Sequence, residues 1–298
     1  MQRHKLAALS VGLVIAGTLA GCSGGGGGGS SNGTLSLGLF DAPVSGVNNI
    51  FLDITEVDLK PTNGNAISFM LSPAVGNQDL LNLTPDDFAA LLDSVSVPAG
   101  HYEWVQLKVD SASSYAMTDA GGRVPLTVPS GIARLVSGFT ITADQKAEFR
   151  IDWNVREGLV DPVGTQGYKL QPALRMIDMQ QYGTLEGSID ATALLAYSAS
   201  DGSGCATGDP NVDVGNVVYI YAGSGATPGT DTPVATADAN PNADNTAYVY
   251  KTILSPGQYT VAFTCQAELT TASPPGSPAF WTPVNANITN GADVTVNF

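Results

Sequence analysis

Histidine and basic residues are scarce in this sequence of 298 residues, and each shortage excludes a class of function. Of the two histidines, only His101 lies beyond the first ten residues, so catalysis by a histidine base beside a nucleophile has a single candidate. Twelve Lys and Arg stand against 27 Asp and Glu, which gives a net charge of −15. A chain with this charge repels phosphate backbones, so we exclude nucleic acid as a partner.

Long hydrophobic runs are absent as well. The longest apolar stretch, residues 6–20, is shorter than the ~18 to 20 residues that a membrane-spanning helix requires. It follows Arg3 and Lys5 and leads directly to Gly21 and Cys22, a layout typical of an export signal. We therefore expect residues 1–21 to be a signal peptide and not a transmembrane anchor.

The end of this stretch, Leu19-Ala20-Gly21-Cys22, resembles the lipobox of bacterial lipoproteins. The resemblance implies cleavage before Cys22 and attachment of acyl chains such as palmitate to this residue, so that lipid holds the chain at a membrane. By the lipoprotein sorting rule, Ser23 implies transfer to the outer membrane. An ordinary secretory signal is the alternative. Residues 22–33 include six consecutive glycines and are expected to form a flexible tether.

Charge and cysteine divide the rest of the chain. Without the signal peptide, ten basic residues remain and the net charge is −17. Residues 34–180 hold 17 acidic and nine basic residues, whereas residues 181–298 hold ten acidic residues and one basic residue. This asymmetry predicts two domains with those bounds. In an oxidising compartment Cys205 and Cys265 are expected to form a disulfide, and a metal-binding or catalytic thiol pair is the alternative.

Alternation of apolar and polar residues predicts that the first domain consists mainly of β-strands. Residues 35–39 and residues 148–156 both alternate with a period of two, which is typical of half-buried strands. In residues 50–59 the apolar phase shifts near Thr55, which predicts a β-bulge there.

One helix is expected in the first domain. Residues 84–87 provide a threonine cap, a proline and two acids, all favoured at a helix start. Phe88, Leu91 and Leu92 follow at helical spacing. This predicts a short helix that packs on the sheet and ends near residue 93 or 94.

Two similar motifs predict turns that lead into strands. They are Pro98-Ala99-Gly100-His101-Tyr102 and Ser255-Pro256-Gly257-Gln258-Tyr259, in which proline fixes the entry and glycine permits a positive φ. They resemble a recurring feature of transthyretin-like and carboxypeptidase-regulatory-like β-sandwiches. In the second domain, residues 183–189 and 217–221 are the expected first and core strands. The predicted fold is mainly β, with two antiparallel β-sandwiches, transthyretin-like or immunoglobulin-like, in series.

The first domain also resembles a known family through the order of its motifs. These are Gly38-Leu39-Phe40-Asp41-Ala42-Pro43, the strand at residues 50–59, Leu80-Leu81-Asn82-Leu83, the Pro98 turn and Lys169-Leu170-Gln171-Pro172. They are similar to the domain of unknown function 4382, found in bacterial lipoproteins. The resemblance covers about half of the chain and implies its fold and location, but no enzyme activity.

Few residues suggest catalysis or metal binding. The sequence contains no Gly-x-Ser-x-Gly elbow, no His-Glu-x-x-His motif and no phosphate-binding glycine loop. His101 belongs to a turn motif and is expected to be structural. Two loops rich in oxygen ligands are weak calcium candidates, and turn residues in solvent are the alternative. The first loop contains Asp201, Asp209 and Asp213, and the second contains Asp238, Asn240, Asn242, Asp244 and Asn245. No other cofactor is expected.

Aromatic residues offer a candidate binding surface. Tyr102, Trp104 and Trp281 could form a platform for sugar rings. Alternation in the strand over residues 102–109 places Tyr102 and Trp104 on one face, which is exposed unless the predicted helix covers it. Burial in the core is the alternative. Asp41 is a further candidate ligand, or a residue that closes an Asx turn.

These patterns favour a non-enzymatic, membrane-tethered envelope protein that binds a protein or glycan partner or acts as a spacer. The rival hypothesis is a lipoprotein hydrolase that acts on envelope polysaccharide through a carboxylate pair. Paired carboxylates in a deep cleft would favour the rival.

Overall fold

The computed structural model describes residues 31–41, 47–75, 78–118, 121–160, 167–195, 215–267 and 278–298. Ser31–Phe298 form one compact unit. Within the described residues, no helix has the length and hydropathy that crossing a membrane would need.

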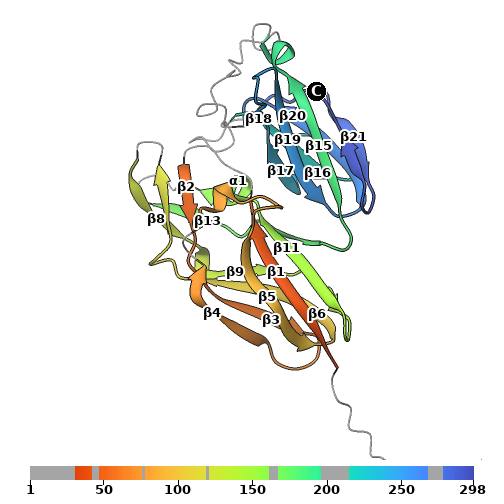
Figure 1. Ribbon diagram of the computed structural model, residues 1–298. Helices are drawn as coiled ribbons and strands as arrows, with labels where there is room; N and C mark the ends of the chain where they lie inside the picture. Colours follow the sequence, from red (N-terminus) through yellow and green to blue (C-terminus); the bar gives the residue numbers. More distant parts are fainter. Residues whose placement is uncertain are drawn as a thin grey trace, which may run out of the picture. The chain divides into compact units, whose positions relative to one another are not determined.

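The strands before residue 180 form three sheets (Figure 1). The first has the order β14-β11-β1-β5, with β1 Asn32–Phe40, β5 Ala89–Pro98, β11 Lys146–Trp153 and β14 Leu174–Asp178. The second has the order β10-β6-β3-β4, with β9 also paired to β6, and comprises β3 Ile54–Pro61, β4 Ile67–Val75, β6 Gly100–Val109, β9 Ile132–Leu135 and β10 Phe139–Ile141. The third has the order β12-β13-β8-β7-β2, with β2 Val47–Phe51, β7 Tyr115–Thr118, β8 Arg123–Thr127, β12 Leu159–Val160 and β13 Tyr168–Leu170. Three short helices accompany them, η1 Leu80–Asn82, η2 Pro129–Gly131 and α1 Val155–Gly158.

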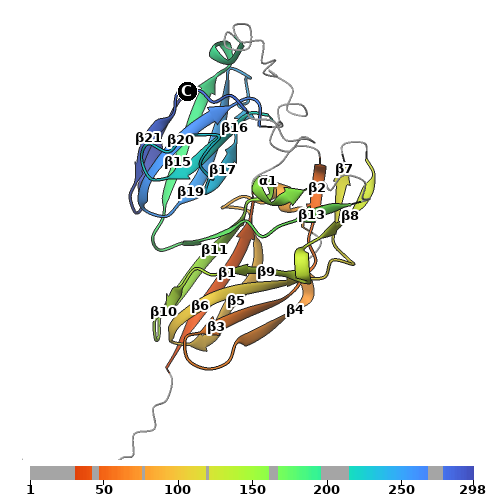
Figure 2. The same cartoon turned by 180° about the vertical axis from the view of Figure 1, so that it is seen from behind.

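The first two sheets share one hydrophobic core. Leu35, Leu37 and Leu39 of β1 are buried in the same cluster as Leu59 of β3 and Leu107 of β6. Because strand side chains alternate between faces, each sheet turns an apolar face toward this core and its other face away from it. Figure 2 shows β3, β4, β6 and β10 side by side in the second sheet.

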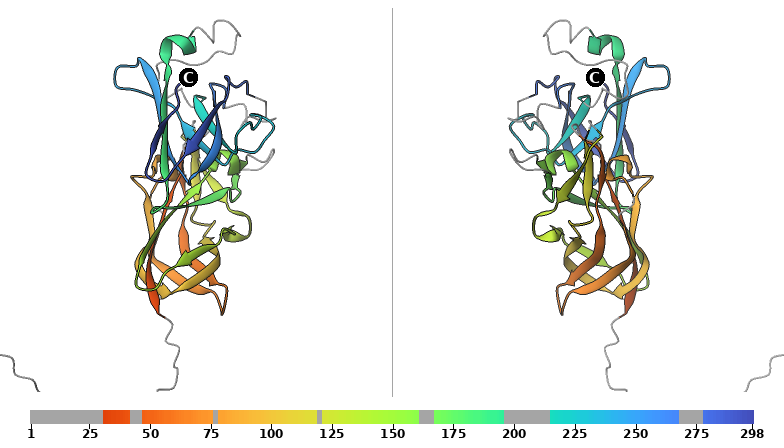
Figure 3. Two further views of the ribbon diagram at one scale, coloured as in Figure 1. Left: turned by 90° about the vertical axis from the view of Figure 1, so that its right-hand side faces the viewer. Right: turned by 90° about the vertical axis from the view of Figure 1, so that its left-hand side faces the viewer.

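The strands after residue 180 form two further sheets, seen from the side in Figure 3. The first has the order β18-β19-β15-β22, with β15 Gly183–Asp190, β18 Asn240–Pro241, β19 Ala247–Leu254 and β22 Asp293–Thr295. The second has the order β17-β16-β20-β21, with β16 Val217–Ala222, β17 Ala235–Asp238, β20 Gly257–Thr264 and β21 Val284–Ile288. Leu185 of β15 and Ile220 of β16 belong to one buried cluster, so these two sheets also enclose a core.

The structure confirms the predicted mainly β fold. Most neighbouring strands are antiparallel, while the pairs β1–β11, β8–β13 and β15–β22 are parallel. No described sheet contains strands from both sides of residue 180. The division into domains at residues 180 and 181 stays a prediction.

Two local predictions are confirmed. The pairing of β3 with β4 and with β6 shifts between Ile54 and Glu56, which places the expected bulge at Thr55. Both turn motifs lead into strands, β6 from Gly100 and β20 from Gly257. In each motif the tyrosine hydroxyl donates a hydrogen bond to the carbonyl oxygen four residues earlier, over 2.8 Å from Tyr102 and 2.9 Å from Tyr259.

The predicted helix after Thr84 is wrong. The amide of Asp87 does donate to the Thr84 hydroxyl over 3.0 Å, but β5 begins at Ala89. In β5 the pairing with β1 shifts so that Leu91 and Leu92 are both buried. A bulge therefore produces the spacing that resembles one face of a helix.

The strand over residues 148–156 also differs from its prediction. It ends at Trp153, and α1 begins at Val155 with Asn154 as its N-cap. The alternating polar residues Arg150, Asp152, Asn154 and Arg156 are buried, not exposed. Alternation in this segment therefore reflects two buried faces, one apolar and one that carries these polar side chains.

Candidate functional site

The outer face of the second sheet carries an ordered group of polar and aromatic side chains around Trp104. We call it the Trp104 face. It consists of Glu56, Asp58 and Lys60 of β3, Ser68 and Met70 of β4, Trp104, Gln106 and Lys108 of β6, and Arg134 of β9. The residues between them in sequence, such as Val57, Val105 and Leu107, are buried in the core.

One row of hydrogen bonds crosses four strands of this face. Ser68 Oγ donates to Asp58 Oδ1 over 2.5 Å, and Gln106 Nε2 donates to Asp58 Oδ2 over 3.0 Å. Arg134 donates from Nε and Nη2 to Gln106 Oε1, over 2.9 and 2.6 Å. Because each residue fixes its neighbour, the row is held in one geometry before any ligand arrives.

Lys108 is closely paired with both acidic residues of the face. Lys108 Nζ lies 2.9 Å from Glu56 Oε1 and 3.4 Å from Asp58 Oδ2. Burial raises the pKa of Asp58, but the hydrogen bond from Ser68 and the Lys108 charge outweigh it and lower that pKa below its usual value. Asp58 therefore stays ionised and keeps accepting hydrogen bonds at neutral pH.

Trp104 occupies the row next to these hydrogen bonds. It pairs with Lys60 across the sheet and is only partly buried. The Arg134 guanidinium lies 4.5 Å from the centroid of its ring, a cation–π contact that holds the indole in place. The sequence pattern does not mark Arg134 as part of this face, because Ile132, Ala133 and Leu135 around it are all apolar.

The other candidate aromatics do not join Trp104. The β3–β6 pairing shifts between Lys60 and Pro61, so Tyr102 turns into the core, where it is 0% exposed and stacks on Phe139 at 5.0 Å. The prediction that Tyr102 shares a face with Trp104 is therefore wrong. Trp281 packs edge-on against Phe263 in the second core, with ring centroids 5.2 Å apart.

His101 and Asp41 have structural surroundings. His101 is exposed, and its Nδ1 lies 3.3 Å from the hydroxyl of Thr140 on β10. Asp41 is buried and accepts a hydrogen bond from the Val155 amide over 2.9 Å. Asp41 therefore anchors the start of α1, a contact between distant residues that the expected Asx turn does not include.

A buried cluster of charges links residues before and after position 180. Arg156 Nη2 lies 3.2 Å from Asp238 Oδ1, and Arg175 Nη2 lies 2.6 Å from Asp152 Oδ2. Arg175 Nη1 also donates to the Ile253 carbonyl over 2.9 Å. Asp41, Asp152 and Asp238 line a pocket of about 350 Å³ beside these pairs.

Burial changes the protonation of this cluster. It raises the pKa of Asp238 to about 6, although the positive charge of Arg156 opposes the change. Burial also raises the pKa of Asp152, against the opposing charge of Arg175. Asp238 was expected in an oxygen-rich loop that either binds calcium or lies in solvent, whereas its side chain is only 10% exposed.

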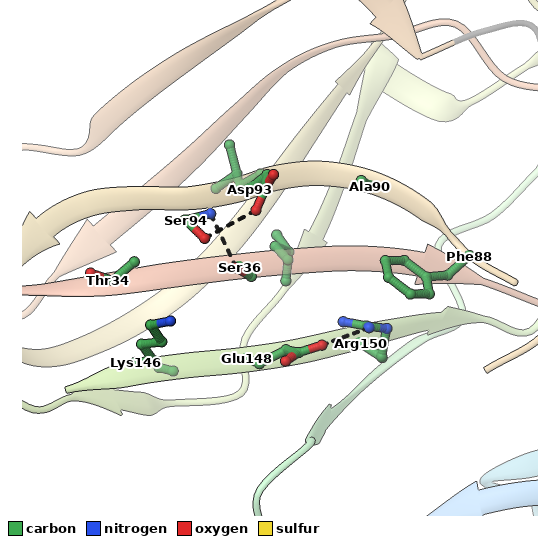
Figure 4. Close-up of a pocket in the computed structure, with 12 residues that line it drawn as sticks. Thr34, Ser36, Phe88, Ala90, Asp93, Ser94, Lys146, Glu148 and Arg150 are labelled. Atoms are coloured by element: carbon green, nitrogen blue, oxygen red, sulfur yellow. Dashed lines mark hydrogen bonds and ion pairs between the residues drawn. The ribbon is translucent and has the colours of Figure 1, made fainter. Parts of the chain in front are cut away.

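A second pocket, of about 410 Å³, lies on the outer face of the first sheet (Figure 4). The Arg150 guanidinium lies 3.4 Å from the centroid of the Phe88 ring and pairs with Glu148 over 2.7 Å. Ser94 donates from its amide to the Ser36 hydroxyl over 3.1 Å. In this pocket Arg150 is therefore paired with both an aromatic ring and a carboxylate.

The remaining candidate residues are outside the described parts of the chain or are used in turns. Cys22, Cys205, Asp201, Asp209 and Asp213 lie outside the described residues, so lipid attachment, the pairing of Cys205 with Cys265, and the first calcium loop stay predictions. In the second loop, Asp244 accepts hydrogen bonds from Thr246, and these lower the pKa of Asp244. Among the described residues, no group of three or more His, Cys, Asp or Glu side chains is placed to hold a metal ion.

Comparisons with solved structures give distant matches. The Bacillus anthracis TIE protein is 13% identical with a TM-score of 0.22, and the match covers 90% of this chain and 33% of that one, so this chain spans about a third of its length. A Bacteroides ovatus protein named as a candidate adhesin is 11% identical with a TM-score of 0.23, covering 95% and 98% of the two chains. The minor pilin GBS52 of Streptococcus agalactiae is 10% identical with a TM-score of 0.20, covering 88% and 94%. Similarity this low carries no conclusion about this chain.

Comparison with protein families is more informative. No curated protein matches the chain. A family model matches the segment that contains β1 to β13 and the Trp104 face, a little under half of the chain. The resemblance inferred from the order of motifs is thereby confirmed, because residues 32–172 match the model described as Domain of unknown function (DUF4382).

Proposed function

We propose that this chain is a non-enzymatic, lipid-anchored envelope protein that binds a glycan on the Trp104 face. The observation that carries the proposal is the partly exposed Trp104, held by Arg134 beside a fixed row of hydrogen-bonding groups. An aromatic ring packs against the apolar face of a sugar, while adjacent amide, guanidinium and carboxylate groups bond its hydroxyls.

The charge of the face supports the choice of an uncharged or acidic glycan. Lys60, Lys108 and Arg134 outnumber Glu56 and Asp58 here, although the whole sequence carries a net charge of −15. An acidic ligand is therefore repelled less at this face than elsewhere on the chain. A protein partner with an acidic surface is the other ligand compatible with these groups.

The proposed location rests on sequence. The lipobox-like tetrad and the glycine-rich stretch after Cys22 support attachment to a bilayer, and Ser23 supports the outer membrane. Such a tether would hold the Trp104 face near envelope polysaccharide while leaving it free to reorient.

Binding to a glycan array tests this function with the unit Ser31–Phe298. Trp104→Ala is expected to reduce affinity for the glycans retained by the unsubstituted protein by tenfold or more. Tyr115→Ala is the matched control, because Tyr115 also lies under an arginine, with Arg123 3.8 Å from its ring centroid, but belongs to β7. Equal losses in both variants, or binding to no glycan at all, would contradict the proposal.

One observation favours a second candidate, a hydrolase that uses a carboxylate pair. Asp152 and Asp238 line the same pocket, and the raised pKa of Asp238, about 6, is what a general acid requires. However, an arginine pairs with each carboxylate. Release of reducing sugar from envelope polysaccharide, lost in Asp238→Asn and retained in Trp104→Ala, would favour this candidate over binding.

A further inference from the structure

Strand β4 forms an open edge of the second sheet. On one side of this nine-residue strand, the segment from Ile67 to Met70 pairs with β3, with Met70 opposite Glu56, and Val75 pairs with Ile54 after a break in the register. On the other side it has no strand partner among the described residues. An edge strand of this length presents unpaired backbone donors and acceptors, to which another strand can add.

This edge lacks the charges that usually prevent such addition. Residues 61–78, which include all of β4, contain no charged residue, although the chain carries 27 acidic residues. The edge strands of the neighbouring sheet differ, since β5 contains Asp93 and β14 contains Arg175 and Asp178. Met70 is 71% exposed, and Ile67, Phe69 and Leu71 are only partly buried at the border of the core.

We infer that β4 pairs with β4 of a second copy of this chain, in antiparallel register about a two-fold axis. The pattern of the strand is complementary to itself. With Phe69 opposite Phe69, Ile67 lies opposite Leu71 and extends the core stripe, while Ser68 lies opposite Met70 on the outer face.

Charge favours this edge over β5 and β14 as the contact between copies. Two chains with the same large negative charge repel each other, and the repulsion is smallest where an uncharged stretch approaches its own copy. Backbone hydrogen bonds and apolar contacts then supply the attraction without burying a carboxylate.

The pairing has a consequence for binding. Two sheets joined through β4 form one continuous sheet, and the two-fold axis perpendicular to it places both Trp104 faces on the same side. The dimer itself does not depend on what Trp104 binds, but it would make any such binding bivalent.

Thiol cross-linking of the full chain in membranes of its host tests the pairing. Met70→Cys places a thiol diagonally across the seam from its copy, at about 7 to 8 Å, in reach of a short bismaleimide. Val136→Cys is the matched control. Val136 is also exposed, at 76%, but it follows β9, which pairs with β6 away from the β4 edge. A band at twice the chain mass in Met70→Cys alone supports the pairing. No such band, equal bands in both variants, or a band with a different protein would overturn it.

A second variant separates pairing from folding. Met70→Lys places a lysine opposite Glu56 within the monomer, which preserves the fold, but brings like charges together across the proposed seam. Sedimentation of the detergent-solubilised full chain should show a dimer that Met70→Lys weakens by tenfold or more, while the melting temperature of the monomer at high dilution is unchanged. Unsubstituted chain that sediments as a monomer at tens of micromolar would overturn the inference.

Discussion

The side chains of the buried charge cluster set how stability depends on pH. An unfolded aspartate has a pKa of 3.8, whereas burial raises the pKa of Asp238 to about 6 in the folded chain. Between these values the folded chain holds a proton that the unfolded chain has released. The free energy of unfolding therefore falls as pH rises from about 4 to 6, by roughly 1 to 3 kcal/mol, and this contribution is constant above that window.

Asp238→Asn is expected to remove this contribution, since an amide does not titrate in this range. Urea unfolding of both chains from pH 4 to pH 7 measures it, with Asp152 left in place as a common background. The stability difference, unsubstituted minus variant, should decrease between pH 4 and pH 6. Parallel curves would show that Asp238 titrates normally and that burial does not perturb it.

At the scale of elements, one glycine fixes how the last strand docks. A Cβ on Gly187 of β15 would collide with the Val296 carbonyl oxygen, just beyond β22. The chain there is held in place, because the Val296 amide donates to the Glu186 carbonyl over 2.9 Å. Gly187→Ala is therefore expected to destabilise the fold by about 2 to 4 kcal/mol.

Gly257→Ala is the control for this substitution. A Cβ on Gly257 meets the Tyr259 ring at 3.4 Å, an ordinary contact, so the cost should stay below about 1 kcal/mol. Thermal unfolding of both variants measures the difference. If Gly187→Ala lost no more stability than Gly257→Ala, the β15–β22 contact would be more adaptable than its packing indicates.

Sequence pattern predicts strands well where one face is buried and one is exposed. The alternation of Leu35, Leu37 and Leu39 and the phase shift at Thr55 both describe the folded chain. Prediction failed where a bulge imitates helical spacing, at Leu91 and Leu92, because periodicity alone does not distinguish the two.

The candidate site was predictable only in part. Trp104 was found from strand alternation, but Tyr102 was misplaced because nothing local in the sequence marks the register shift before Pro61. Arg134 and the Arg156–Asp238 pair join residues far apart in the chain. Such contacts depend on the order of strands in the sheets, which composition and spacing do not specify.

At the scale of the whole molecule, acylation decides where binding takes place. Chain purified from its native host is expected to begin at Cys22 and to carry the added mass of acyl chains, and the Cys22→Ser variant is expected to be released from membranes. Intact-mass spectrometry measures the first and membrane fractionation the second. A mature chain without acyl mass would contradict attachment to the membrane by lipid, and with it the proposed location.

The most direct test of glycan binding uses the three tryptophans of the chain. Their indole N–H groups give separate nuclear magnetic resonance signals, and the buried Trp153, which donates to the Gln171 carbonyl over 3.2 Å, is an internal control. Titration with envelope polysaccharide fragments should shift the Trp104 signal and leave the Trp153 signal unchanged. Saturable binding that shifts only the Trp281 signal, or that leaves every indole signal in place, would contradict a ligand site at Trp104.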